Sequence, residues 1–538
     1  MRIWIGLLFA AVAAPVAAQP VPPPKLIVAI AVDQFSSDLY DEYRPHFTAG
    51  LNRLGSGVAF HNGYQSHNAT ETCPGHSTIL TGSHPSRTGI VANVWYDLDQ
   101  QRSDKAVYCA EDERVPGSSS TAYTVSPLHL MVPTLGDRLK AIRPGSRNVA
   151  VSGKDRGAVM MTGHHADQRW YWASNKFVTD LKGVTVPQTL AKANVAIANA
   201  LSQPRPALES TPFCQAKAKS FAIEGGGKPV GGGALARAAG DAAGFRASPE
   251  LDGTTLAIAA GLVDEMQLGR GADPDVLAIS LSATDYVGHS YGTEGQEMCL
   301  QMLALDRELG DFLAFLDSRG LDYSVVLTAD HGGLDVPERQ RTGAHPDAAR
   351  IDSGLGASKI GAALVKKLGL TGPGLYGDNF GDIYVDKALT PARRKLVLDG
   401  AVAAYRAHPQ VEAVFTAEQL MATPVPTGSP VDWSLIQRAR ASYYAGRSGD
   451  FVVLLKRNIT PIADTSRYVA THGSPWDYDR RVPVLFWRKG VGSLALDTPV
   501  ETTDILPTLA ATIGLAIPAG SIDGHCLAAV AGDTCTPR

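Results

Sequence analysis

Three features are scarce in this 538-residue sequence: excess charge of one sign, long hydrophobic runs and closely spaced cysteine pairs. The formal net charge of −4 leaves no basic excess to neutralise phosphates, so we expect no nucleic-acid binding. No stretch approaches the roughly 20 apolar residues that cross a bilayer, so we expect no membrane anchor. The lack of a C-x-x-C pair argues against a metal bound by thiolates.

The N-terminus has the pattern of a signal peptide. Arg2 precedes an apolar run from Ile3 to Ala14, and Val16-Ala17-Ala18 supplies small residues for cleavage. We therefore expect residues 1–18 to be removed, leaving Gln19 as the first mature residue. No cysteine follows the cleavage site, which disfavours a lipoprotein. The sequence predicts a periplasmic or secreted protein.

Six cysteines remain after cleavage, and an even number in an exported protein indicates up to three disulfides. The sequence leaves all fifteen pairings open. Cys526 with Cys535 is the most local choice. A bond between Cys73 and Cys109 would brace the segment around Thr72.

Strand-like and helix-like segments alternate along the chain. Buried apolar runs predict strands at Lys25–Val32, Val58–Phe60, Arg147–Val151, Val276–Leu281, Ser324–Thr328, Phe451–Leu455 and Val482–Trp487. Helical spacing predicts helices over 38–54, 187–201, 294–319, 391–407 and 502–514. This order predicts an α/β fold with a mostly parallel central sheet and helices on both faces. We expect one domain over 19–538, with insertions around 95–145 and 165–250.

Aspartates follow three of the predicted strands. Asp33, Asp285 and Asp330 each stand at or just after a strand end. Because the carboxyl ends of parallel strands share one edge of a sheet, these carboxylates are expected to meet there.

Histidines accompany two of these aspartates. His289 follows Asp285 by four residues, which puts both on one face of a helical turn, and His331 is adjacent to Asp330. His472 adds a third imidazole beside a glycine. Three Asp and three His without cysteine suit zinc or a related ion, and their number suits two ions.

Each of these residues also has a structural interpretation. An Asp at a strand end is commonly a turn residue or helix cap, and an isolated His is commonly a core or surface residue. We expect His76 to pack or cap, and His164 and His165 to line the rim of a pocket. The histidines interpreted as structural are His46, His61, His67, His84, His129, His345, His408 and His525.

Thr72 lies in the stretch H-N-A-T-E-T-C-P-G-H-S-T-I, just before a predicted helix start at Pro74. A helix N-terminus favours an anion or an alkoxide because its N–H groups are free. The alternative is a simple helix cap.

These motifs, in this order, resemble the alkaline phosphatase superfamily. They are A-V-D33, T72-C-P-G-H-S-T-I-L-T-G, D285-x-x-x-H289, D330-H331-G and T-H472-G. The resemblance implies that one zinc is held by Asp33, Thr72, Asp330 and His331. It implies that the other zinc is held by Asp285, His289 and His472.

Within the superfamily, the chain is similar to the phosphate-irrepressible alkaline phosphatases that use a threonine nucleophile. Sulfatases are disfavoured because Thr72 stands where their modified cysteine would be. Phosphoglycerate mutases are disfavoured because the predicted export signal does not suit them. The segments G-I-V-A-N93-V-W-Y-D and G-K154-D155-R156-G carry the closer resemblance. It implies that Asn93, Lys154 and Arg156 bind the phosphoryl oxygens. In an extended segment, Lys154 and Arg156 would point to the same side.

The resemblance implies zinc-dependent hydrolysis of phosphate monoesters with broad specificity. Thr72 would form a phosphothreonine, and inorganic phosphate would be released. The expected partners are small phosphate esters, and the expected state is a monomer. Two alternatives stay open: a phosphodiesterase or nucleotide pyrophosphatase on the same fold, and a non-catalytic zinc-binding exported protein.

Overall fold

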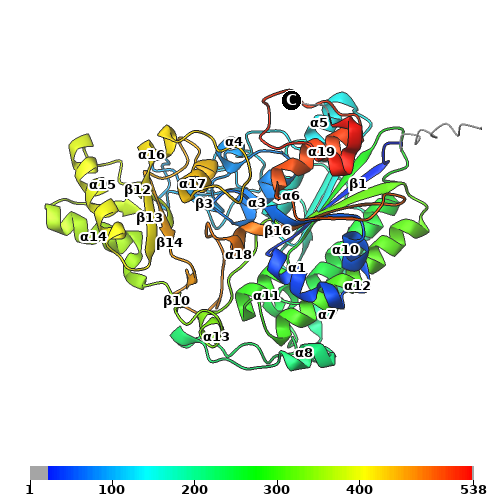
Figure 1. The fold of residues 1–538 in the computed structure, drawn as a ribbon, viewed down its shortest axis with the longest axis horizontal. Helices are drawn as coiled ribbons and strands as arrows, with labels where there is room; N and C mark the ends of the chain where they lie inside the picture. Colours follow the sequence, from blue (N-terminus) through cyan, green and yellow to red (C-terminus); the bar gives the residue numbers. More distant parts are fainter. Residues whose placement is uncertain (1–21, 536–538) are drawn as a thin grey trace, which may run out of the picture.

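A ten-stranded sheet forms the centre of the computed structural model, which describes residues 22–535 (Figure 1). The strands are β1 (Leu26–Val32), β2 (Val58–Tyr64), β5 (Asn148–Ser152), β6 (Gln168–Ala173), β7 (Lys176–Val178), β8 (Asp275–Leu281), β9 (Tyr323–Thr328), β16 (Arg481–Arg488), β17 (Leu494–Leu496) and β18 (Val500–Glu501). Their order is β17-β2-β16-β9-β1-β8-β5-β6-β7, with β18 paired to β2. The predicted signal peptide lies outside the described residues.

The middle of this sheet is parallel. β1 pairs in parallel with both β8 and β9, and β5 pairs in parallel with β8 and β6. β16 runs antiparallel to β9 and β2, and β7 runs antiparallel to β6. The predicted α/β class with a mostly parallel sheet is confirmed, with antiparallel strands toward the edges.

Helices cover both faces of the sheet, because alternate side chains of the buried strands point in opposite directions. In β1, Val28 and Ile30 pack into one core while Ala29 and Ala31 pack into the other. The first core is covered by α1 (Ser37–Tyr43), α2 (Gly50–Gly55), α7 (Gln188–Ser202), α10 (Pro249–Glu265) and α12 (Gln296–Ser318). The second is covered by α3 (Thr72–Ile79), α5 (Leu135–Ile142), α6 (Asp155–Thr162) and α19 (Ile505–Thr512).

A second, antiparallel sheet forms its own hydrophobic core to the left in Figure 1. Its order is β11 (Leu375–Tyr376), β12 (Gly381–Val385), β14 (Phe451–Leu455) and β13 (Val411–Thr416). The helices α14 (Ala357–Leu368) and α15 (Pro391–Arg406) pack against it, with α16 (Ala417–Ala422) and α17 (Leu435–Ser442) nearby. The predicted strand Phe451–Leu455 therefore exists but belongs to this second sheet, which the sequence pattern did not separate from the first.

Shorter elements connect these layers. They are α4 (Pro85–Thr88), β3 (Val94–Tyr96), β4 (Ala106–Tyr108), α8 (Pro212–Ala216), α9 (Ala242–Arg246), α11 (Ala283–Tyr291), α13 (Pro337–Gln340), β10 (Ala349–Arg350), β15 (Ile459–Thr460), α18 (Asp477–Arg480) and α20 (Ala528–Ala531).

One predicted helix is wrong in its extent. The single helix expected over 38–54 is two helices, α1 and α2, separated by a 3-10 turn at Arg44–His46. Pro45 lies in this turn, and a proline cannot donate the backbone hydrogen bond that would continue α1. The helices predicted near 187–201, 294–319 and 391–407 are confirmed as α7, α12 and α15, and the last predicted helix is the shorter α19.

Three disulfides join Cys73 to Cys109, Cys214 to Cys299 and Cys526 to Cys535. Both pairings singled out from the sequence are present. Within residues 22–535, no helix is long and apolar enough to cross a bilayer.

Candidate active site

The strand order places the charged residues side by side. The neighbouring strands β9, β1, β8 and β5 are followed by Asp330, Asp33, Asp285 and Lys154. Asp285 lies in the first turn of α11, and Lys154 is the residue before α6. Because these parallel strands end at one edge, residues far apart in sequence share one buried site.

Two overlapping groups of side chains have the arrangement of metal ligands. One contains Asp285, His289 and His472, and the other contains Asp33, Asp285 and His331; within each group the ligand atoms lie within 4.8 Å of one another. His331 Nε2 also lies 3.3 Å from Asp330 Oδ2. Asp285 therefore stands between the two groups and is shared by them.

The three imidazoles are oriented by backbone carbonyls. The Nδ1 atoms of His289, His331 and His472 lie 2.8 Å from the carbonyl oxygens of Ala470, Gly332 and Thr70, respectively. A carbonyl only accepts, so each Nδ1 carries a proton, and a ring in its neutral form presents a lone pair at Nε2. Fixing the tautomer through the far nitrogen is the usual arrangement behind a metal-binding histidine.

The acceptor atoms in this cluster face one another. His289 Nε2 and His472 Nε2 lie 3.3 and 3.4 Å from Asp285 Oδ1. Asp33 Oδ1, Asp285 Oδ1 and His331 Nε2 are buried without hydrogen-bond partners. Burial raises the pKa of the Asp33 carboxyl, and the neighbouring carboxylates Asp285 and Asp330 raise it further. Cations between these acceptors would relieve the repulsion, so the residues fit metal ions.

Thr72 is the first residue of α3, with Glu71 at the N-cap position. Its Oγ1 lies 3.4 Å from Lys154 Nζ and 3.4 Å from Arg156 Nη2. The Lys154 ammonium also contacts the carboxylates of Asp33 and Asp285, at 2.5 and 2.6 Å. The hydroxyl is therefore held between two cations at a helix N-terminus.

The Lys154-Asp155-Arg156 segment is not extended as predicted. Asp155 begins α6, so only Lys154 has extended backbone, and Arg156 lies in the first helical turn. Asp155 points away from Thr72 and accepts hydrogen bonds from the hydroxyls of Tyr108 (2.7 Å) and Tyr123 (2.8 Å). Tyr108 also contacts Arg156 at 3.4 Å. The two tyrosines, which the sequence did not single out, fix the orientation of this turn.

Asn93 is tied to the start of α3. Its Oδ1 accepts a hydrogen bond from Cys73 N (2.8 Å), and its own N–H donates to Glu71 Oε2 (2.7 Å). Cys109 N donates to the Asn93 carbonyl at 2.9 Å, and the Cys73–Cys109 disulfide joins the same two segments. The side-chain oxygen of Asn93 is thus occupied, which leaves its NH₂ group as a donor.

Two motif glycines allow close approaches at the site. A Cβ at Gly75 would lie 2.0 Å from the carbonyl oxygen of Asp330, and a Cβ at Gly288 would lie 1.6 Å from Gln34 Oε1. Gln34 has a left-handed backbone (φ 63°), and its N–H donates to Asp330 Oδ1 at 3.2 Å. A larger residue at Gly75 would displace the backbone that carries Asp330, whereas at Gly288 it would displace the Gln34 side chain.

Other histidines lie as follows. His76 contacts Asp330 Oδ2 through Nδ1 and Ser280 Oγ through Nε2, both at 2.9 Å, so it packs beneath the site. The predicted pocket-rim position of His164 and His165 is wrong. Both follow the C-terminal end of α6, whose opposite end carries Arg156, and His164 Nε2 bonds to the Leu130 carbonyl.

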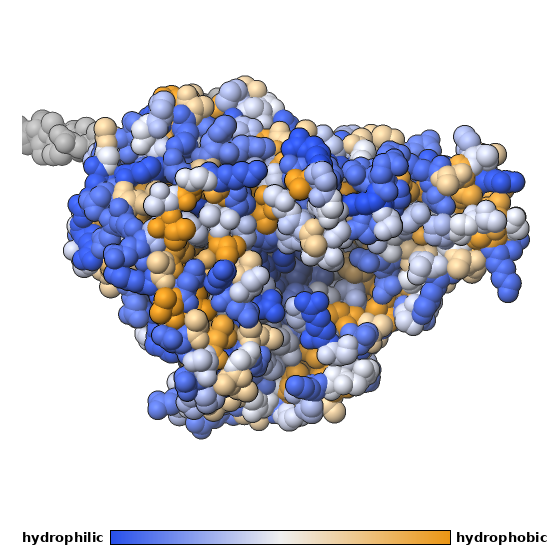
Figure 2. All heavy atoms as spheres, turned by 180° about the vertical axis from the view of Figure 1, so that it is seen from behind, coloured by the Kyte–Doolittle hydropathy of each residue, from blue (hydrophilic) through white to orange (hydrophobic). Residues whose placement is uncertain are grey.

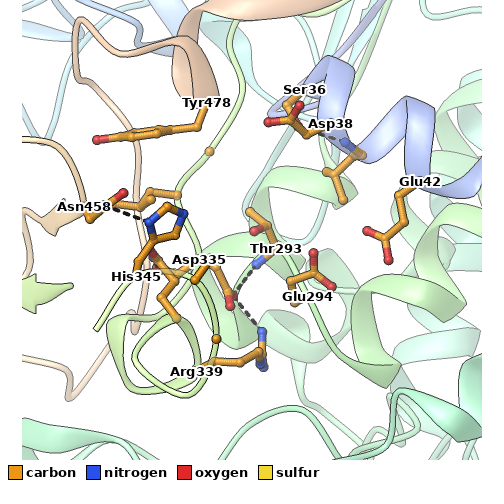
Figure 3. Close-up of a pocket in the computed structure, with 16 residues that line it drawn as sticks. Ser36, Asp38, Glu42, Thr293, Glu294, Asp335, Arg339, His345, Asn458 and Tyr478 are labelled. Carbon is orange, nitrogen blue, oxygen red and sulfur yellow. Dashed lines mark hydrogen bonds and ion pairs between the residues drawn. The ribbon is translucent and has the colours of Figure 1, made fainter. Parts of the chain in front are cut away.

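Two hollows lie near these residues. A small cavity of about 60 Å³ is lined by Glu71 and Gly473, the chain neighbours of Thr72 and His472. A larger pocket of about 470 Å³ opens beyond the Asp330–Gly333 turn, between Glu42, Glu294 and Asp335 (Figure 3). None of the predicted site residues lines this larger pocket. Figure 2 shows hydrophilic residues lining a hollow near the middle of the opposite face.

The chain is similar over most of its length to known proteins. The family model of Type I phosphodiesterase / nucleotide pyrophosphatase matches residues 27–475. The chain is 55% identical over 520 residues to alkaline phosphatase PhoK of a Sphingomonas species, covering 95% of this chain and 93% of PhoK. It is 47% identical over 509 residues to alkaline phosphatase PhoD of Zymomonas mobilis, covering 94% and 88% of the two chains.

A solved structure has the same overall fold. The crystal structure of alkaline phosphatase PafA aligns with a TM-score of 0.82 at 26% identity, covering 95% of this chain and all of that one. The motifs around Asp33, Thr72, Asp285, Asp330 and His472 lie within the residues matched by the family model. The chain belongs to the Type I phosphodiesterase / nucleotide pyrophosphatase family of the alkaline phosphatase superfamily.

Proposed function

We propose that this chain is an exported phosphomonoesterase that transfers the phosphoryl group of its substrate to Thr72 and then to water. The observation that carries the proposal is the pair of cations, Lys154 and Arg156, each 3.4 Å from the Thr72 hydroxyl at the start of α3. The similarity to proteins named alkaline phosphatases, over nearly the whole chain, supports the same activity.

The residues around Thr72 match the charge of a phosphoryl group. Arg156 presents planar N–H donors that suit two oxygens, and its Nε is buried without a partner. Lys154 supplies a point charge, and the NH₂ group of Asn93 supplies a neutral donor. Phosphoryl-transfer catalysis depends mainly on such positioning and on charge stabilisation.

Two metal ions, which we propose to be zinc, would be held by the clustered Asp and His side chains. Asp33, Thr72, Asp330 and His331 would hold one, and Asp285, His289 and His472 the other, with Asp285 close to both groups. When bound, such ions lower the pKa of coordinated hydroxyls and neutralise charge on transferring oxygens.

The proposed reaction has two displacements. Thr72 Oγ1 gives up its proton to solvent and attacks phosphorus in line while the P–O bond to the alcohol breaks, and the departing oxygen takes a proton to leave as the alcohol. Water then attacks the phosphothreonine, the Thr72 Oγ1–P bond breaks, and inorganic phosphate leaves. Lys154, Arg156 and Asn93 hold the three outer oxygens in both steps.

A monoester is the preferred substrate because it carries more negative charge than a diester, and this site supplies two cations for that charge. A solved variant of PafA carries substitutions at a threonine, an asparagine, a lysine and an arginine. These are the residue types of Thr72, Asn93, Lys154 and Arg156, in the same order. A phosphodiesterase is the second candidate, because the family model covers phosphodiesterases and nucleotide pyrophosphatases.

Hydrolysis of an aryl phosphate and of the matching aryl phosphate diester tests the choice. We expect the ratio of kcat/KM to favour the monoester by at least about a hundredfold, the effect of one oriented charge interaction at a transferring group. A ratio below one would identify a phosphodiesterase.

Export is part of the proposal. The three disulfides indicate an oxidising compartment, which agrees with the signal peptide predicted from residues 1–18. We propose a periplasmic or secreted enzyme acting on small phosphate esters as a monomer.

A further inference from the structure

The small cavity beside Thr72 lies between the two sheets. Glu71, which precedes Thr72, and Gly473, which follows His472, form one wall, and Asp382 of β12 in the second sheet lies in the other. A Cβ placed on Gly473 would be 3.5 Å from the Phe380 ring and 3.8 Å from Glu71 Cγ, so these walls converge. The cavity therefore lies against the two segments that carry Thr72 and His472.

Hydrogen-bond acceptors dominate the polar lining of this cavity. Asn68 lines it, is only 5% exposed, and has its Oδ1 buried without a hydrogen-bond partner. Glu71 Oε2 and Asp382 Oδ1 each accept one backbone N–H, from Asn93 and Gly449. Asp378 adds a third carboxylate. A ligand that fills this space must donate hydrogen bonds and is favoured if it is positive.

Three aromatic residues contribute to the apolar part of the lining. Tyr96, Phe380 and Tyr384 line the cavity, and the Tyr384 hydroxyl lies 2.7 Å from the Arg447 carbonyl, to which it donates. Aromatic rings attract a cation near their faces. Burial, together with the Glu71 carboxylate and against the Gly449 N–H, raises the pKa of Asp382 to about 7, so a nearby cation would stabilise its ionised form.

We propose that this cavity binds a primary ammonium group on the leaving alcohol, and that short aminoalkyl phosphate monoesters are preferred substrates. The inference rests on the proposed phosphomonoesterase activity and names its substrate class. Thr72 Oγ1 bonds to phosphorus as the P–O bond to the amino alcohol breaks, and the leaving oxygen takes a proton from solvent.

The size of the cavity limits the ammonium group. A volume of about 60 Å³ holds roughly four water-sized groups, since one water needs about 10–15 Å³ of such space. A 2-aminoethyl group fits that space, whereas a trimethylammonium group with its linker exceeds it. We therefore expect 2-aminoethyl phosphate to be hydrolysed with a higher kcat/KM than its trimethylated analogue.

The test compares 2-aminoethyl phosphate with propyl phosphate, which has the same shape without the charge. Because an ammonium also makes the alcohol a better leaving group, the ratio of the two kcat/KM values is compared between variants. Asp382→Asn removes the negative charge of that side chain but keeps an oxygen that accepts from Gly449 N. Asp378→Asn removes the negative charge of Asp378. Asp399→Asn, on the exposed side of α15, is the matched control.

We expect each cavity variant to lower the ratio of kcat/KM for 2-aminoethyl phosphate to kcat/KM for propyl phosphate by about tenfold, which is the effect of one hydrogen bond to a charged group. The rate with propyl phosphate and the behaviour of the control should stay unchanged. As a second readout, 2-aminoethylphosphonate should inhibit aryl phosphate hydrolysis at least about tenfold more strongly than propylphosphonate.

Three results would overturn the inference. They are a preference unchanged in both cavity variants, equal inhibition by the two phosphonates, and a higher kcat/KM for the trimethylated ester. Each of these results leaves aryl phosphate turnover intact, so the proposed function would stand. Failure to hydrolyse any monoester, the aryl phosphate included, would instead remove the proposed function and this inference with it.

Discussion

Replacing Arg156 by alanine removes the donor pair best placed to bind phosphoryl oxygens. The guanidinium Nη2 lies 3.4 Å from Thr72 Oγ1, its Nε is buried and unpartnered, and Tyr108 contacts its Nη1 at 3.4 Å. Loss of one oriented donor at a transferring group costs about 2.7–4 kcal/mol, or roughly 10²–10³ in rate. We expect kcat/KM for an aryl phosphate to fall by that factor in Arg156→Ala.

The comparison of substrates makes this prediction specific. Arg156→Lys keeps the charge but loses the planar fork, so we expect a loss of about tenfold, the smaller effect of geometry alone. A phosphodiester carries less negative charge, so its kcat/KM should fall by about tenfold in Arg156→Ala rather than by hundreds. Steady-state kinetics with both substrates measures these losses, and Arg319→Ala, at an exposed ion pair, serves as the control. Equal losses for monoester and diester, or a monoester loss below about threefold, would refute the role given to Arg156.

Three further predictions concern the metal ions, the close packing at the site and a buried ion pair. Dialysis against a chelator should abolish aryl phosphate turnover, and added zinc should restore it. Full activity in protein shown by elemental analysis to be free of metal would contradict the metal-dependent mechanism. Gly75→Ala should greatly reduce both metal content and activity, because its Cβ would lie 2.0 Å from the backbone carbonyl oxygen of Asp330. A Gly75→Ala variant with normal zinc content would show that this contact is unimportant. Burial alone would lower the pKa of His84, but the carboxylates of Glu501 and Asp523 raise it to about 10. The stabilisation from protonated His84 should be complete below about pH 6.5 and should disappear as the pH rises through 10. In urea unfolding at pH 6, the free energy of unfolding of His84→Gln should be about 3–5 kcal/mol lower than that of the unchanged protein. This difference should narrow by pH 10, and a difference that does not change with pH would count against the ion pair.

Much of the main sheet could be predicted because its strands are buried on both faces. The continuous apolar run of β1 (Leu26–Val32) has no polar position to obscure it, and Asp33 directly follows it. The residues that meet at the strand ends, Asp33, Asp285 and Asp330, followed from this pattern and from the rule that parallel strands end at one edge. For Thr72 the local pattern indicated only a helix start, and for His472 only an imidazole beside a glycine, so the proposed roles of both came from the resemblance to a superfamily.

Other features depend on contacts between distant segments. Tyr108, at the end of β4, and Tyr123 contact Asp155 from 47 and 32 residues earlier in the chain, so no spacing rule points to them. The extended interpretation of this segment was wrong because α6 begins at Asp155. The second sheet was not separated from the first because strand β14 has the same buried apolar pattern as the central strands.

The central claim is that Thr72 receives the phosphoryl group. The most direct measurement is mass spectrometry of enzyme quenched in acid during turnover of an aryl phosphate, followed by digestion and sequencing of the peptide that contains Thr72. We predict one phosphoryl group on Thr72 in the active enzyme and none in Thr72→Ala. An unmodified Thr72 peptide together with phosphate on another residue, or rapid turnover by Thr72→Ala, would contradict the account.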